Sequence, residues 1–184
     1  AISVEDDGRG IPTGIHVKEG RSALEVVMTV LHPGGTFAQD SYTDSGGLHG
    51  GGVSCVNALS TLMRTTVHRE GKIWQQEFER GKPMYPVKVI GESDKRGTTQ
   101  YFEPDATIFS TLEYNYDTLA SRMRELSFLN KGIRIILCDD RRKNDDGSAV
   151  CETGYSQGGL KEFVEYLDAN REKLSESVIY MEGE

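Results

Sequence analysis

The sequence has few cysteines and no long apolar run, and both absences restrict what it can be. Its three cysteines are Cys55, Cys138 and Cys151, with no CxxC pair among them. An odd, widely spaced set is not typical of a disulfide framework or a zinc site, so we expect three free thiols in a reducing compartment. No apolar run approaches the roughly 18 residues of a membrane span, and residues 1–10 contain no signal-peptide core. These absences predict a cytoplasmic protein with no membrane partner.

Positive charge is also scarce. Lys and Arg number 21 against 29 Asp and Glu, which gives a formal net charge of −8. An acidic surface does not favour a phosphate backbone, so we do not expect this chain to grip DNA itself. Hydrophobic residues make up 36% of the 184, enough for a core in one domain or one and part of a second. The sequence begins as if in the middle of a strand, over residues 2–5, and ends as if a strand were starting, over 177–184. We therefore expect a piece of a larger protein.

The order of the elements predicts an α+β fold. Ser22 and Glu25 form a capping box, and apolar residues follow at helical spacing until Pro33. Glu70 and Gly71 mark a hairpin turn between two strands. Further helices are expected over 53–59, 116–128 and 159–167, and further strands over 87–91, 98–103 and 133–139. This order is typical of a two-layer α/β sandwich with a mainly antiparallel sheet.

Several common motifs are excluded by spacing. The run GRGIPTG has the glycines of a dinucleotide fingerprint in the wrong register, with Pro12 inside it. Both Gly-Lys pairs are followed by Ile73 or Pro83, so there is no P-loop. The acidic stretch RKNDDGSAVCET has Arg142 and Thr153 where a calcium loop needs its end carboxylates, and it is more typical of a solvated hairpin turn.

Three segments remain: EDDGRGIP, SGGLHGGGVSCVNALS and RGTTQYFEP. Taken singly, they are typical of a tight turn, a flexible connector and a strand start. Together they stand in the order and approximate spacing of the ATP-binding signatures of the GHKL superfamily. The connecting segments, such as PTGIHVKEGRSALEVVMTVLHPGGTF and RELSFLNKGI, resemble the family of bacterial DNA gyrase B subunits over essentially the whole chain. The resemblance implies the GHKL (Bergerat) fold, with an ATP-binding domain over 1–156 and the start of a transducer domain over 157–184.

The resemblance also implies a set of adenine contacts. Asp6 accepts a hydrogen bond from the adenine amino group, which suits a carboxylate because it has no donor when ionised. Gly8 and Gly10 let the backbone approach the base closely. Thr98 supports Asp6 and an ordered water. The other positions are two apolar walls, Ile11 with Pro12 and Val27 with Met28, and two arginines at the pocket mouth, Arg9 and Arg69.

The glycine-rich segment matches the family's phosphate lid. Exposed backbone N–H groups followed by a helix N-terminus suit a triphosphate. The expected contacts are Gly47, Leu48, His49, Gly50, Gly51, Gly52 and Val53. Thr36 and Thr43 stand where the family usually has lysine, and Gly51 where it has valine, which predicts a looser lid and weaker phosphate contact.

The family's catalytic base and its magnesium-holding Asn lie on a helix that would precede Ala1. The resemblance therefore assigns no catalytic residue and no metal ligand within the chain, which is expected to bind ATP without hydrolysing it. The parent is expected to be an ATP-dependent type II topoisomerase that needs Mg²⁺, closes a homodimer through its ATPase domains and acts on DNA with a gyrase A-type subunit. The alternatives are a topoisomerase IV B-type subunit, a GHKL protein kinase, which the β-rich residues 62–103 disfavour, and a non-hydrolysing nucleotide-binding module.

Overall fold

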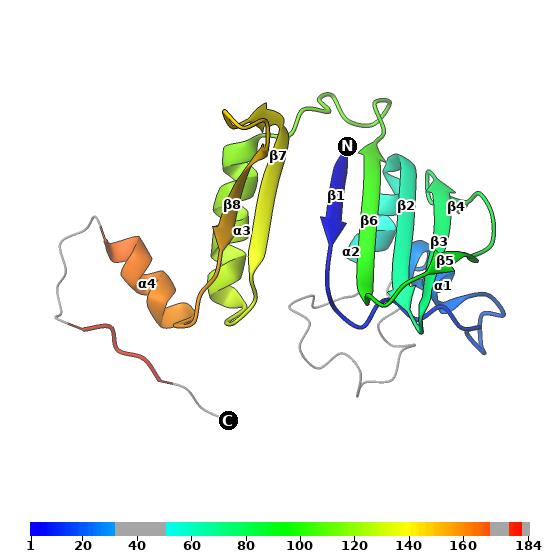
Figure 1. Ribbon diagram of the computed structural model, residues 1–184, viewed down its shortest axis with the longest axis horizontal. Coiled ribbons are helices and arrows are strands. Elements are labelled where there is room, and N and C mark those ends of the chain that lie inside the picture. The colour runs from blue at the N-terminus through cyan, green and yellow to red at the C-terminus, as the bar shows by residue number, and fades with distance from the viewer. Residues whose placement is uncertain (32–50, 170–176, 182–184) are drawn as a thin grey trace. The chain divides into compact units, whose positions relative to one another are not determined.

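The computed structural model describes residues 1–31, 51–169 and 177–181 (Figure 1). The chain forms two compact units, Ala1–Leu112 and Glu113–Glu184. The domain boundary expected after residue 156 does not coincide with this division and stays a prediction. Within the described ranges, no helix is both long enough and apolar enough to span a bilayer.

The first unit is built on an antiparallel sheet, in the order β1-β6-β2-β3-β4, with β5 also pairing with β3. Its strands are β1 (Ile2–Glu5), β2 (Ser60–Arg69), β3 (Lys72–Glu79), β4 (Lys82–Pro83), β5 (Lys88–Glu92) and β6 (Gly97–Pro104). In β2 the buried residues Met63, Thr65 and Val67 alternate with partly exposed ones. Alternation places these three side chains on one face of the sheet, which is the inner face.

Two tight turns fix the register of β3. Glu70 and Gly71 have φ of 55° and 74°, and Arg80 and Gly81 have φ of 48° and 79°. Positive φ at both central residues is the type I′ geometry, whose twist matches that of antiparallel strands. The first of these turns confirms the hairpin predicted from the sequence.

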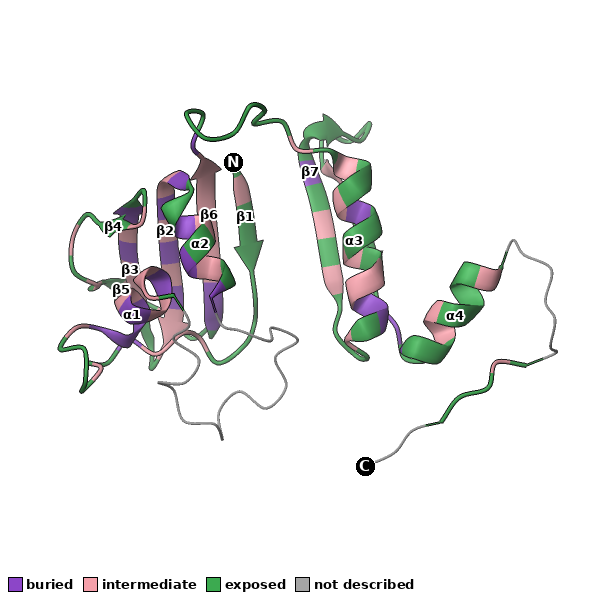
Figure 2. Ribbon diagram, turned by 180° about the vertical axis from the view of Figure 1, so that it is seen from behind, coloured by how far each residue is buried: buried purple, intermediate pink, exposed green. Residues whose placement is uncertain are grey.

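Two helices, α1 (Ala23–Thr29) and α2 (Gly52–Ala58), cover the inner face of this sheet (Figure 2). The predicted cap is present, since the Ser22 hydroxyl accepts a 3.1 Å hydrogen bond from the Glu25 N–H. The predicted end at Pro33 is wrong, because Val30 already has extended backbone angles. Thr29 and Val30 are adjacent β-branched residues, which disfavour continuation of the helix. The Thr29 hydroxyl also donates to the Glu25 carbonyl, a contact that slightly destabilises a helix.

The core of this unit lies between the helices and the sheet. Leu24 and Met28 of α1 pack there against Met63, Val67 and Phe78 of β2 and β3. All five side chains are at most 1% exposed. The helix that carries Val27 and Met28 is therefore fixed on the sheet by apolar contact.

The second unit pairs a hairpin with two helices. Strands β7 (Ile135–Lys143) and β8 (Ala149–Gly154) form the hairpin, α3 (Tyr116–Leu129) packs on it, and α4 (Leu160–Asp168) contacts α3. The Phe128 and Phe163 rings of the two helices stack with centroids 5.2 Å apart. β7 is not the buried strand that its apolar sequence indicates, since Ile136 is 59% exposed. The strand start expected over residues 177–184 is not seen in its described part, residues 177–181.

The prediction of three free thiols is wrong for two of them. Cys138 and Cys151 form a disulfide, while Cys55 is free and exposed. The reason is register: the two cysteines are directly opposed in the β7–β8 ladder, with Cα atoms 4.1 Å apart. That separation is close enough for a bond, and a 13-residue spacing in sequence does not reveal it.

Candidate nucleotide-binding site

The loop after β1 holds Asp6 by backbone contacts with β6. The Asp6 N–H donates to the Thr98 carbonyl at 2.9 Å, and the Thr98 N–H donates to Asp6 Oδ1 at 3.3 Å. The Gly8 N–H donates to the same Oδ1 at 2.9 Å. The Thr98 hydroxyl instead accepts from the Ile11 N–H, at 3.2 Å. The backbone of Thr98 thus orients the Asp6 carboxylate, and its side chain anchors the following loop.

Two glycines let this loop lie flat on the sheet. Gly10 has φ of +74°, and an added Cβ would lie 3.0 Å from both the His68 carbonyl oxygen and Val67 Cγ1. Gly97 has φ of +131°, and an added Cβ would collide with the Asp6 carbonyl oxygen. Glycine adopts such backbone conformations and close approaches without strain, whereas a side chain at either position would be strained or would clash. The sequence indicated Gly10, whereas it predicted Gly97 only as part of a strand start.

Arg69, at the end of β2, fastens the same loop from the other side. Its Nη1 donates to the Gly10 carbonyl at 2.9 Å and to the Arg9 carbonyl at 3.3 Å, while Nε pairs with Glu70. The Arg69 guanidinium therefore stabilises the loop after β1 by hydrogen bonds to its backbone. Its expected place at a pocket mouth, and that of Arg9, stay predictions.

The residues expected to form apolar walls lie at different depths. Ile11 is partly buried and packs on the core cluster, and Pro12 is also partly buried. On α1, Val27 is partly exposed, whereas Met28 is 0% exposed. Only Ile11, Pro12 and Val27 therefore have surface that a ligand could contact in this structure. Met28 is buried and would support this wall by packing.

The expected phosphate segment is described only in part. Gly47, Leu48, His49 and Gly50 lie outside the described residues. Gly51 is the N-cap of α2, which begins at Gly52 and includes Val53. The Ser54 hydroxyl donates to the Gly51 carbonyl at 2.9 Å, so the cap carbonyl is occupied. The start of a helix directly after the glycines agrees with the sequence prediction.

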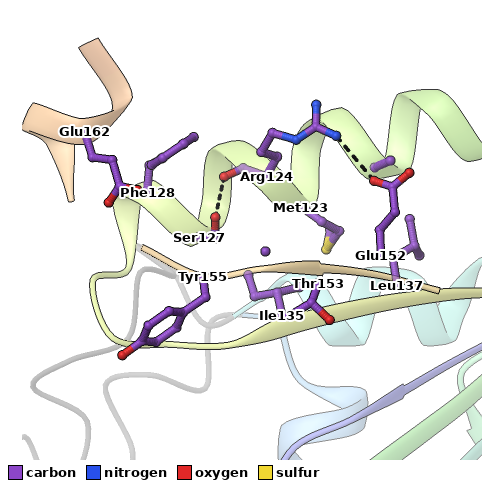
Figure 3. Close-up of a pocket in the computed structure, with 12 residues that line it drawn as sticks. Met123, Arg124, Ser127, Phe128, Ile135, Leu137, Glu152, Thr153, Tyr155 and Glu162 are labelled. Atoms are coloured by element: carbon purple, nitrogen blue, oxygen red, sulfur yellow. Dashed lines mark hydrogen bonds and ion pairs between the residues drawn. The ribbon is translucent and has the colours of Figure 1, made fainter. Parts of the chain in front are cut away.

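A separate cavity of about 280 Å³ lies in the second unit, between α3 and the hairpin (Figure 3). Its apolar lining includes Met123 and Leu137. Its charged groups already have partners: Arg124 pairs with Glu152 at 3.3 Å, and Glu162 accepts from Ser156. We assign it to the packing of this unit rather than to a ligand.

A family comparison agrees with the fold and with the placement of the loop. Residues 1–108 match the family described as "Histidine kinase-, DNA gyrase B-, and HSP90-like ATPase". The match covers more than half of the 184 residues, and the chain belongs to this family.

Within that family, the chain is similar to gyrase B subunits. It is 52% identical to the DNA gyrase B subunit of Halalkalibacterium halodurans over 185 positions, covering 100% of this chain and 28% of the relative. It is 58% identical to that of Cytophaga hutchinsonii over 146 positions, covering 79% and 30%. The chain thus spans about 28% to 30% of the length of these relatives.

A solved structure supports the same conclusion. The 43K ATPase domain of Thermus thermophilus gyrase B, in complex with an aminocoumarin, matches with a TM-score of 0.73 and 32% identity, covering 95% of this chain and 42% of that one. The predicted α+β GHKL fold is therefore confirmed.

Proposed function

We propose that this chain binds ATP as the nucleotide-binding part of a gyrase B-type subunit. The observation that carries the proposal is the state of the Asp6 carboxylate. Its Oδ1 accepts two backbone N–H groups, whereas Oδ2 accepts no hydrogen bond from the described residues. Asp6 is exposed, so Oδ2 is available to a ligand. A fixed acceptor with no donor suits the amino group of adenine and opposes the carbonyl that guanine carries there.

The remaining contacts follow the same placement. Ile11, Pro12 and Val27 would enclose the base, with Gly8 and Gly10 allowing close approach. Arg9 and Arg69 would lie at the entrance, and Thr98 would act through Asp6. The backbone of Gly51, Gly52 and Val53, with Gly47, Leu48, His49 and Gly50 before them, would receive the phosphates.

We also propose that Mg²⁺ accompanies ATP, bound to its triphosphate. No group of three His, Cys, Asp or Glu side chains within the described residues could hold a metal ion. In the loop after β1, Asp6 Oδ1 already accepts two backbone N–H groups, and Asp6 Oδ2 is the proposed acceptor for adenine. The described donor set therefore does not fit a magnesium site, and we derive no step through the metal.

The activity of the whole protein goes beyond this chain, since the chain spans less than a third of its relatives. We propose that the parent is an ATP-dependent type II topoisomerase in which nucleotide binding closes a homodimer. It would act on DNA in the cytoplasm with a gyrase A-type subunit. The similarity to DNA gyrase B subunits supports this over a topoisomerase IV subunit or a protein kinase.

Calorimetric titration of the chain with ATP and with GTP tests the proposal. We expect ATP to bind at least about tenfold more tightly, because GTP would place a carbonyl against a carboxylate at the cost of about one charged hydrogen bond. An aminocoumarin, the ligand class of the Thermus domain, should compete with ATP. Equal affinity for the two nucleotides would contradict the role of Asp6, and no binding of either would contradict the function.

A further inference from the structure

A row of polar side chains crosses the inner face of the sheet. Thr65 of β2 is paired in register with Gln76 of β3 on one side and with Gln100 of β6 on the other. Opposed residues on neighbouring antiparallel strands share a face, so the three side chains lie side by side. Thr65 and Gln76 are 0% exposed. Buried polar groups cost stability unless they are hydrogen-bonded, and their partners therefore indicate what the row does.

Two partners of this row lie on α1, and a third is the Tyr85 carbonyl, which accepts from Gln76 Nε2 at 2.9 Å. At one end, Gln76 Nε2 donates to Glu25 Oε2 at 2.7 Å. At the other end, the Thr65 hydroxyl donates to Gln100 Oε1 at 2.7 Å, and Gln100 Nε2 donates to Met28 Sδ at 3.6 Å. Glu25 and Met28 are three residues apart and so lie on one face of the helix. The sheet therefore holds α1 by two polar contacts as well as by its apolar face.

The two contacts of the row with α1, Gln76 with Glu25 and Gln100 with Met28, differ in how firmly they fix the helix. A carboxylate and an amide at 2.7 Å make a directional contact that fixes the helix backbone near Glu25. Met28 has a flexible, unbranched side chain that fills whatever space is offered. The Thr65 hydroxyl holds the Gln100 amide by its Oε1, and the NH₂ group of that amide is turned toward the Met28 sulfur, which can accept a hydrogen bond but cannot donate one.

The same strand also serves Asp6. Thr98 and Gln100 are two residues apart on β6, so both side chains face inward. The backbone of Thr98 orients the Asp6 carboxylate, and the side chain of Gln100 contacts Met28. One stretch of β6 thus connects the proposed adenine acceptor with the methionine beneath the facing helix wall.

We propose that Thr65 and Gln100 act as a positioning pair for Met28, and through it for the α1 wall of the nucleotide site. The pair touches no ligand in this account. This inference rests on the proposed ATP site for its functional consequence, but its structural part, the coupling of the pair to Met28, stands without it.

Methionine-methyl NMR of the whole 184-residue chain, with ATP titration, tests the pair. Gln100→Val removes the amide, and Thr65→Val replaces the hydroxyl with a methyl of similar size. Each variant should shift the Met28 methyl signal in the ligand-free protein and weaken ATP binding by about 3- to 10-fold, the effect of one net hydrogen bond. The double variant should do no more than Gln100→Val alone, because that substitution already removes both the Thr65–Gln100 hydrogen bond and the contact of the amide with Met28. Thr65→Ser should restore the wild-type signal.

The chain offers a matched control on the opposite face of the sheet. Gln75 Nε2 donates to the Thr66 hydroxyl at 3.5 Å, the same kind of pair facing away from α1. Gln75→Val and Thr66→Val should leave the Met28 signal and the ATP affinity unchanged.

Three results would overturn the inference: an unmoved Met28 signal, additive losses in the double variant, or equal effects of the control pair. If Gln100→Val does not fold, the comparison of Thr65→Val with Thr65→Ser decides alone. If the wild-type chain binds no ATP, the proposed function fails, while the Met28 signal still shows whether the pair positions it.

Discussion

The Cα of Gly97 faces the carbonyl oxygen of Asp6 so closely that a Cβ added to Gly97 would collide with that oxygen. The same glycine has φ of +131°, a conformation that other residues rarely adopt. The approach of the Asp6 loop to β6 therefore depends on the absence of one side chain, directly before the threonine that orients the carboxylate.

Gly97→Ala should unfold or displace this loop. We expect a loss of about 2–4 kcal/mol in the free energy of unfolding, from a strained conformation together with overpacking, and loss of ATP binding. Urea denaturation followed by Trp74 fluorescence measures the first effect, because Trp74 is the single tryptophan and lies on β3.

Two other glycines provide graded controls. Gly71 has φ of +74° and open space around its position, so Gly71→Ala should cost about 1–2 kcal/mol from backbone strain alone. Gly14 has open space and no positive φ, so Gly14→Ala should change stability by at most about 0.5 kcal/mol. An equal effect of all three substitutions would show that the close approach of Gly97 has no special importance.

Acid should weaken the first unit through Asp105. Hydrogen bonds from the Thr107 N–H and hydroxyl, and from Arg80, lower the pKa of this buried carboxyl from 3.8 to about 2. Because the pKa is lower in the folded chain, the contribution is complete above about pH 4 and is lost as pH falls through 2.

Asp105→Asn should lower the unfolding midpoint at pH 7 and flatten its pH dependence between about pH 4 and 2. Trp74 fluorescence again reports on this unit. Asp139→Asn is the matched control, since Arg141 likewise lowers the pKa of Asp139 to about 2, but in the second unit. An Asp105→Asn profile as steep as that of the wild type would contradict the assignment.

The disulfide gives a chemical prediction. Without reductant, alkylation should modify Cys55 alone, and after reduction it should modify all three cysteines. Intact-mass measurement would show one added group in the first case and three in the second. Three groups added without reductant would show that the Cys138–Cys151 bond does not form in solution.

Local signals in the sequence predicted much of the fold. Ser22 with Glu25 identified the start of α1, and Glu70 with Gly71 identified the hairpin between β2 and β3. The run from Tyr116 predicted α3 to within one residue at its end. In each case a cap, a turn residue or a periodic apolar face lies within a few positions of what it determines.

The features that were missed depend on which residues are placed opposite each other, and these pairs lie 13 or more positions apart in the sequence. Cys138 meets Cys151, Thr65 meets Gln100, and Gly97 meets Asp6, through registers that no local motif encodes. Asp6 itself was predicted because its motif resembles a known family. The way in which Thr98 holds it, by backbone rather than by hydroxyl, required the structure.

The central claim is that Asp6 recognises adenine, and Asp6→Asn tests it most directly. Asparagine can keep the Oδ1 contacts to Gly8 and Thr98, which would place its NH₂ where Oδ2 now lies. The NH₂ group of the asparagine would then face the amino group of adenine, and two donors cannot form a hydrogen bond with each other. We expect ATP affinity in calorimetry to fall by about 10- to 150-fold, corresponding to about 1.5–3 kcal/mol for a charged hydrogen bond, and the preference for ATP over GTP to shrink.

The neighbouring Asp7→Asn removes an equal charge from an exposed side chain next in sequence and should leave ATP affinity within about twofold. The account predicts a large loss for Asp6→Asn with little change for Asp7→Asn, both measured on the 184-residue chain at one salt concentration. Unchanged ATP binding by Asp6→Asn, or equal losses in the two variants, would contradict it.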